Sequence, residues 1–126
     1  MKRFFTLIAT TVILSSFSAL ISIDEVVAAL KNGDAAQIAK YFDNTVEITM
    51  PDKSNTYSKS QAEMVIKDFF TNNEVKTFEV IHKGDNAGSQ YCIGNLVTKA
   101  ATYRTTVYMK QKGDRQVLQE IRFENK

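Results

Sequence analysis

The chain has one cysteine and one histidine, Cys92 and His82, among its 126 residues. A single cysteine can form no internal disulfide bond, and together with one histidine it cannot supply the three or four ligands of a zinc site. The segment Gly84-Asp85-Asn86 lacks the acidic spacing of a calcium-binding loop. Phosphate-binding glycine loops, dinucleotide fingerprints and serine nucleophile elbows are missing as well. The sequence therefore predicts no metal site, no cofactor and no recognisable catalytic motif.

The start of the chain has the pattern of a secretory signal peptide. Lys2 and Arg3 are followed by an apolar run from Phe4 to Leu14 and by small residues from Ser16 to Ala19. The run is shorter than the roughly 20 apolar residues of a membrane span, and no cysteine follows it that could carry a lipid. We expect residues 1–19 to be cleaved, no membrane anchor to remain, and the protein to work in the periplasm or outside the cell.

The charge balance of the remaining chain excludes a strongly basic protein. Removing residues 1–19 lowers Lys+Arg from 16 to 14 by taking away Lys2 and Arg3, and it leaves Asp+Glu at 14. A formally neutral domain gives no support to a nucleic-acid partner, which requires a net basic face. Residues 20–126 have the length of a single domain.

Two short helices are expected first. Ser22 and Glu25 have the spacing of a capping box, and an apolar residue recurs every three or four positions until Gly33, which favours a helix end. Asp34 is a good cap for a second helix, and the same spacing continues to Phe42. The two segments predict a helical hairpin with a very short turn.

The period then changes to two between Thr45 and Met50, which predicts a half-buried strand that stops at Pro51. The polar segment from Pro51 to Ser58 is expected to be a loop or a brief hairpin. A third, longer helix begins at Ser58 or Ser60, buries an apolar stripe, and ends at Asn72 or Asn73.

Four strands separated by turns are expected after the third helix: Val75–Lys83, Gln90–Lys99, Thr102–Lys110 and Gln116–Glu124. Helices and strands are grouped in the sequence and do not alternate, which predicts an α+β fold with an antiparallel sheet and helices on one of its faces.

The order of these elements resembles the nuclear transport factor 2-like, or cystatin-like, cone, in which a strongly bent sheet wraps around a long helix and a helical hairpin closes one end. Four segments resemble more closely the exported domain of unknown function 4783 family within that superfamily: His82-Lys83-Gly84, Tyr91 to Leu96, Tyr103-Arg104 and Ile121 to Glu124. Cys92 stands where the resemblance implies alanine. The family has no established activity, so the resemblance implies only the fold, export and a pocket between sheet and helices.

The single histidine has two interpretations. In strict alternation His82 shares a face with Phe78 and Val80, which predicts that it points inward. It is then either a hydrogen-bonded histidine at a strand end or a general base.

The second interpretation belongs to a ketosteroid isomerase or polyketide cyclase type of enzyme, in which Tyr91 or Tyr103 would donate to a developing oxyanion. A catalytic histidine needs a carboxylate to orient it. Asp43 and Asp68 are the candidates, and neither pairing is specified by spacing.

Our first hypothesis is a non-enzymatic domain that binds a small apolar or amphipathic ligand, or a protein partner. A ligand would occupy a pocket in a part of the core left unfilled. The walls of this pocket are expected to include Phe42, Phe69, Phe78, His82 and Tyr103.

Cys92 lies among apolar neighbours, which predicts a buried inert thiol, with a reactive or intermolecular thiol as the alternative.

The partner surface is expected on the other face of the sheet. Alternation places Arg104, Tyr108 and Arg122 there. The two arginines either belong to a cross-strand salt-bridge ladder or, with Tyr108, dock an envelope protein or a second subunit. The third hypothesis, a structural homodimer, needs only this face. Its other expected members are Leu118, Glu120 and Glu124.

Overall fold

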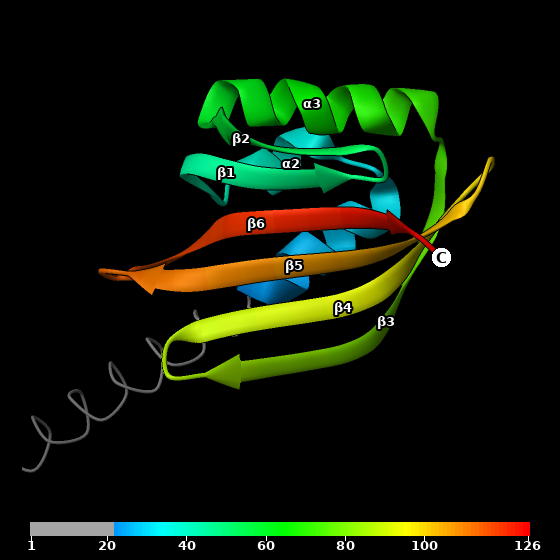
Figure 1. The fold of residues 1–126 in the computed structure, drawn as a ribbon. Helices are drawn as coiled ribbons and strands as arrows, with labels where there is room; N and C mark the ends of the chain where they lie inside the picture. Colours follow the sequence, from blue (N-terminus) through cyan, green and yellow to red (C-terminus); the bar gives the residue numbers. More distant parts are fainter. Residues whose placement is uncertain (1–21) are drawn as a thin grey trace, which may run out of the picture.

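The computed structural model describes residues 22–126, which form one α+β fold (Figure 1). The expected signal peptide over residues 1–19 lies outside the described residues. A helical segment over 22–32, α2 (Ala35–Ala39) and α3 (Lys59–Asn72) accompany one sheet. Its strands are β1 (Phe42–Met50), β2 (Lys53–Ser58), β3 (Val75–Asn86), β4 (Ser89–Thr98), β5 (Thr102–Lys112) and β6 (Arg115–Asn125).

The sheet has the strand order β2-β1-β6-β5-β4-β3. Neighbouring strands are antiparallel except β1 and β6, which run parallel, so the sheet is mixed. Local pattern cannot reveal this pairing, because β2, α3 and the three strands β3 to β5 lie between the two partners in the sequence. Figure 1 shows the helices behind and above the curved sheet, while its front carries no helix. We call the covered side the inner face and the other side the outer face.

The helical hairpin is shorter than its pattern predicts. Ser22 is already helical, so it is not the cap. Gly33 ends the first segment with a positive φ of 62°, and the Asp34 side chain accepts a hydrogen bond from the backbone N–H of Gln37 at 3.1 Å, as expected of a cap.

The second helix ends at Ala39, whereas Phe42 belongs to β1 and not to the helix. The backbone N–H of Leu118 donates to the carbonyl of Tyr41 at 2.6 Å. Pairing with β6 thus takes the chain out of the helix before the apolar spacing ends.

The long helix α3 begins where its sequence predicts. Ser58 and Gln61 form a complete capping box, and Ala62, Ile66 and Phe70 are buried. Of the loop and the brief hairpin expected for the segment before it, the structure has a hairpin, in which strand β2 pairs with β1. Its polar residues gave no alternating apolar signal.

The inner face is filled by apolar side chains that the helices cover. An aromatic cluster joins the end of α3 to the sheet: the Phe69 ring stacks on Phe123 at 4.5 Å and meets Tyr103 edge-on at 5.2 Å between centroids. The Tyr103 hydroxyl donates to Oδ1 of Asn73 at 3.0 Å. The largest fully buried side chains include Leu30, Ile38, Phe42, Ile48, Ile66, Phe78, Leu96, Met109, Leu118, Ile121 and Phe123.

A bulge in β3 reverses the expected orientation of His82. Val80 pairs with Gly94 and His82 with Ile93, which leaves Ile81 as an extra residue. His82 is consequently exposed and shares the outer face with Ile93, so the prediction that it points inward is wrong.

A second bulge, at Gln119 in β6, changes the face of the sheet on which Leu118 lies. Tyr108 pairs with Glu120 and Met109 pairs with Leu118, so one residue of β6 has no opposite partner. Leu118 is therefore fully buried on the inner face. Its expected place on the outer face is wrong.

Candidate functional site

The side chains expected to line a ligand pocket do not surround one cavity. Phe42 and Phe78 are each 1% exposed and belong to the packed core. Phe69 and Tyr103 contact each other at the end of α3, whereas His82 lies on the opposite face of the sheet. The inner face therefore works as a core at these positions.

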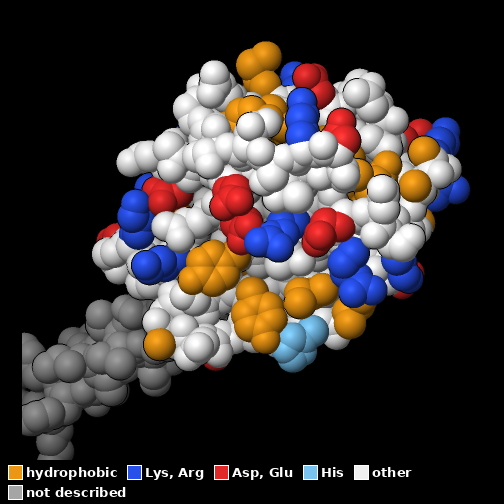
Figure 2. All heavy atoms as spheres, in the orientation of Figure 1, with side chains coloured by type: hydrophobic (Ala, Val, Ile, Leu, Met, Phe, Trp, Pro, Cys, Tyr) orange, Lys and Arg blue, Asp and Glu red, His pale blue; other side chains and the backbone are white. Residues whose placement is uncertain are grey.

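The outer face brings together the three residues expected to bind a partner. Arg104 and Tyr108 lie on β5, Arg122 lies opposite Thr106 of β5, and all three side chains point away from the helices. Figure 2 views this side and shows basic and acidic side chains interleaved at the centre, with hydrophobic side chains and the histidine below them. The sheet register thus confirms that the three residues share a face.

Two tyrosines form the aromatic part of the outer face. Tyr91 and Tyr108 are directly opposite each other on β4 and β5. The Tyr91 hydroxyl lies 2.8 Å from Nε2 of His82, and the Tyr108 hydroxyl lies 2.9 Å from Oγ of Ser89. These hydrogen bonds fix the positions of the two hydroxyl groups, and both side chains are half-buried.

The sequence could not reveal the tyrosine pair. Alternation alone places Tyr91 and Ile93 on one face of β4, but only the register between β4 and β5 sets Tyr91 beside Tyr108. Gly84 makes room for the pair, since a Cβ there would come within 2.6 Å of the Tyr91 ring.

The charged part of the outer face lies on β5 and β6. Nε of Arg122 donates to Oε2 of Glu120 at 2.8 Å, and this hydrogen bond, with the charge of Glu120, raises the pKa of Arg122. Arg104 lies opposite Glu124 in the register of β5 and β6. Its Nε nevertheless donates to Oδ1 of Asn95, on β4, at 3.2 Å. The Arg122–Glu120 pair joins two residues of β6, so the expected cross-strand ladder is not formed by either arginine within the described residues.

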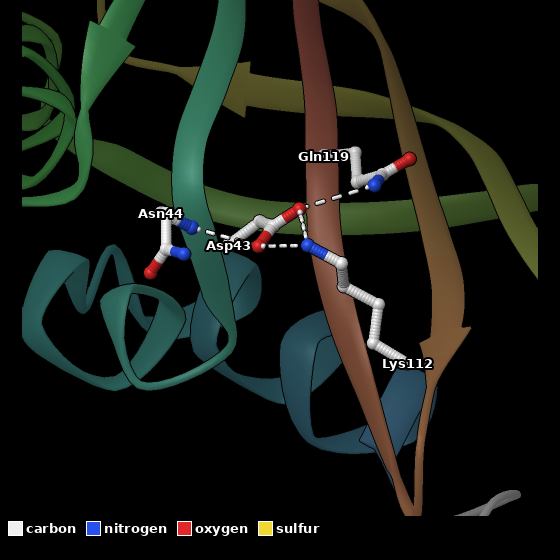
Figure 3. Close-up of polar contacts among 4 residues, drawn as sticks. All are labelled: Asp43, Asn44, Lys112 and Gln119. Atoms are coloured by element: carbon white, nitrogen blue, oxygen red, sulfur yellow. Dashed lines mark hydrogen bonds and ion pairs between the residues drawn. The ribbon is translucent and has the colours of Figure 1, made fainter.

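A cluster around Asp43 borders the outer face (Figure 3). Lys112 Nζ donates to both carboxylate oxygens at 3.0 and 3.1 Å, and Gln119 Nε2 donates to Oδ2 at 3.1 Å. Burial by itself would raise the pKa of Asp43, but hydrogen bonds from Lys112, the Asn44 backbone and Gln119, with the Lys112 charge, lower it. The cluster joins β1, β5 and β6, and the β6 bulge residue serves as one of its donors.

A shallow cleft of about 330 Å³ opens beside this cluster. Asp43, Glu47 and Glu120 give it three carboxylates, and the ring of Tyr108 forms part of its wall. This end of the outer face is therefore acidic.

The residues that the enzyme hypothesis requires do not lie together in one site. His82 and Tyr91 lie on the outer face, whereas Tyr103 is on the inner face. Asp43 is on β1, four strand positions from β3, which is about 19 Å at the usual strand spacing, and Asp68 is exposed on α3. The hydrogen-bond partner of His82 is Tyr91 and not a carboxylate.

Cys92 is buried on the inner face, as expected. Desolvation raises the pKa of its thiol to about 11, which makes the thiolate rare at neutral pH.

Residues 22–126 contain neither a metal-binding cluster nor a membrane-spanning helix. No group of three or more His, Cys, Asp or Glu side chains is arranged there to hold a metal ion. None of the helices in this range is long and apolar enough to cross a membrane.

Comparisons with known proteins agree with the fold. Residues 23–124 match the family described as "Domain of unknown function (DUF4783)". No curated protein matches the chain.

Three solved structures illustrate the similarity. A DUF4783 family protein from Bacteroides uniformis has a TM-score of 0.79 and 28% identity, covering 82% of this chain and 95% of that one. One from Bacteroides ovatus has a TM-score of 0.79 and 27% identity, covering 81% and 93%. An NTF2-like protein of unknown function from Cytophaga hutchinsonii has a TM-score of 0.59 and 9% identity, covering 81% and 84%, and shows the fold alone.

Proposed function

The chain belongs to the DUF4783 family, and from that premise we propose that it is an exported, non-enzymatic domain that binds a second copy of itself through the outer face of its sheet. The observation that carries this proposal is the arrangement on that face: half-buried tyrosines lie beside interleaved charges of both signs, and no helix within residues 22–126 covers them.

The composition of the outer face supports an interface. Tyrosine and arginine are enriched where proteins meet, and an apolar centre with a polar rim is the usual arrangement. Tyr91, Ile93 and Tyr108 supply an apolar centre on β4 and β5. Ile81, the bulge residue next to His82 on β3, is 53% exposed and adds apolar area at the β3 edge.

The mixture of charges favours a second copy over a partner of one sign. Arg122 has the carboxylates of Glu120, Glu124 and Glu47 around it, and Arg104 lies opposite Glu124. A two-fold rotation about an axis through such a face can set the arginines of one copy against the carboxylates of the other. A uniformly acidic partner would instead meet three like charges.

Export is supported by the charged, apolar and small-residue pattern of residues 1–19. All of the described core residues lie between Ile23 and Phe123. Cleavage after Ala19 would therefore leave this core complete, and the processed chain is the form in which the domain acts.

The test is sedimentation equilibrium of residues 20–126 over a wide concentration range. We expect a reversible dimer for the unmodified domain and a monomer for the double variant Arg104→Gln/Arg122→Gln with an unchanged circular dichroism spectrum. Arg115→Gln is the matched control, because Arg115 is exposed at the start of β6, next to the β5–β6 turn and away from the centre of the outer face. It should leave the dimer intact.

A domain that stays monomeric at every concentration would contradict the proposal. If an envelope protein were then recovered on the outer face, that protein would replace the second copy as the partner. A double variant that dimerises like the unmodified domain would place the interface elsewhere.

A further inference from the structure

A second concave site lies between the start of the described helical segment and the β3–β4 hairpin. Its volume is about 290 Å³, near the lower end of the range for small-molecule sites, which begins at about 300 Å³. The helix contributes Ile23 and Asp24, and the hairpin contributes Lys83, Gly84, Asp85, Gln90 and Tyr91. None of the hypotheses above uses this cleft.

Gln90, one of the residues that line the cleft, has a buried hydrogen-bond acceptor without a donor among the described residues. Gln90 is 7% exposed, and its Oε1 accepts no hydrogen bond from the residues that the structure describes. Buried polar groups normally have a partner, and an acceptor left without a donor lowers stability. A ligand with an N–H group would supply the missing donor.

The charges around the cleft specify the kind of donor. Nζ of Lys83 is paired with Oδ1 of Asp24 at 2.8 Å, and the two side chains remain 46% and 61% exposed. Asp85 lies opposite Gln90 in the hairpin register and adds a second carboxylate. The two carboxylates and one ammonium leave a net negative charge, so a cationic donor is favoured.

The size and the apolar wall limit the ligand further. Ile23 lies beside the polar groups and adds an apolar side chain to the lining of the cleft. This arrangement fits a compact molecule with a short hydrocarbon part.

We propose that this cleft binds a small primary ammonium compound, with its ammonium group donating to Oε1 of Gln90 and facing the carboxylates of Asp24 and Asp85. The α-ammonium of a chain cleaved near Ala19 has the same chemistry, so the experiment must separate a free amine from the terminus of the chain itself. This proposal does not depend on dimerisation through the outer face.

The test is titration of residues 20–126 with n-butylammonium chloride, followed by the amide NMR signals of Asp85, Gln90 and Tyr91. We expect saturable shifts at these amides and none with n-butanol, which has a similar shape but no charge. Gln90→Leu should weaken binding about tenfold or more, since a hydrogen bond to a charged group is lost.

Gln116→Leu is the matched control. Gln116 is also 7% exposed and also has an Oε1 without a donor among the described residues, but it does not line this cleft. It should change n-butylammonium binding less than about twofold, and both leucine variants should unfold cooperatively, because each removes an unsatisfied polar group.

The source of the ammonium is settled by repeating the titration with an acetylated N-terminus. If only the acetylated chain binds n-butylammonium, the ammonium preference of the cleft is confirmed and its natural occupant is the α-ammonium of the chain. If both forms bind equally well, the natural ligand is a free amine. Equal shifts with n-butanol, no saturable shifts in either form, or unchanged binding in Gln90→Leu would overturn the proposal.

Discussion

The two faces of the same strand, β4, behave differently. Cys92, Gly94 and Leu96 face the helices and are buried, while the alternating residues Tyr91 and Ile93 face outward and remain half-buried. The inner face excludes water and carries no ion pair at these positions. The outer face also carries apolar side chains, but no helix within residues 22–126 covers it.

The inner-face side chains therefore stabilise the fold, whereas the outer-face side chains are available for binding. Burial of the inner side chains contributes most of the hydrophobic stabilisation, so changes there should alter the free energy of unfolding. Changes on the outer face should alter association and leave the fold intact. Each prediction below tests this division.

The largest effect is expected for Phe123→Ala on the inner face. The Phe123 ring is fully buried and stacks on Phe69 at 4.5 Å. Removing a buried aromatic ring typically lowers the free energy of unfolding by about 3–5 kcal/mol, which urea denaturation would measure. Tyr108→Ala on the outer face is the comparison, and an equal loss there would contradict the division between the faces.

The next effect concerns the thiol of Cys92. Its pKa of about 11 lies two units above the ordinary value of 9.0, so the thiolate fraction at pH 8 should be about 100-fold lower than in the unfolded chain. Burial also blocks the approach of a reagent. Reaction with an aromatic disulfide should be at least that much slower for native than for urea-unfolded protein. Similar rates would show that the inner face is open to solvent.

Two glycines allow the faces to be compared by the same substitution. In Gly94→Ala the new Cβ would lie 2.5 Å from the Phe78 ring and 2.6 Å from the carbonyl of Glu79, and neither can move freely. We expect a loss of about 1–3 kcal/mol in the free energy of unfolding. In Gly84→Ala the new Cβ meets only the far end of the Tyr91 ring.

The Tyr91 ring can swing outward, so Gly84→Ala should reduce stability less than Gly94→Ala. It should instead weaken association, because the ring would leave its place beside Tyr108. Thermal unfolding and sedimentation equilibrium measure the two effects. A reversed order of the two stability losses would contradict the assignment of the faces.

The smallest effect is expected for the Asp43 cluster. Because the pKa of Asp43 is below its ordinary value of 3.8, its contribution to stability is present above that value and is lost as the pH falls through the folded-state pKa. Asp43→Asn should remove about 1 kcal/mol or less at pH 7 and flatten the acid limb of the stability profile. Glu74→Gln, in the fully exposed pair with Lys99, should have no measurable effect.

Local sequence signals predicted the elements that depend on local interactions. The capping box of Ser58 and Gln61, the Asp34 cap and the buried stripe of α3 follow from contacts within a few residues. The alternation of β4 likewise gave the correct burial of Cys92.

Long-range pairing and bulges explain what the sequence did not reveal. The parallel pairing of β1 with β6 and the strand β2 depend on partners far along the chain or on polar residues without a pattern. The bulges after Val80 and at Gln119 each shift the alternation by one residue, which moved His82 outward and Leu118 inward. The shared face of Arg104 and Arg122 was predicted correctly, because β5 has no extra residue and Arg122 lies beyond the bulge of β6, where alternation holds.

The central claim, that the outer face is the docking surface, is tested most directly by amide NMR spectra of residues 20–126 recorded across a dilution series. The account predicts concentration-dependent shifts at Tyr91, Ile93 and Tyr108, with no change at Ile66 in the middle of α3. Shifts confined to the helices, or spectra that do not change while the protein sediments as a monomer, would contradict it.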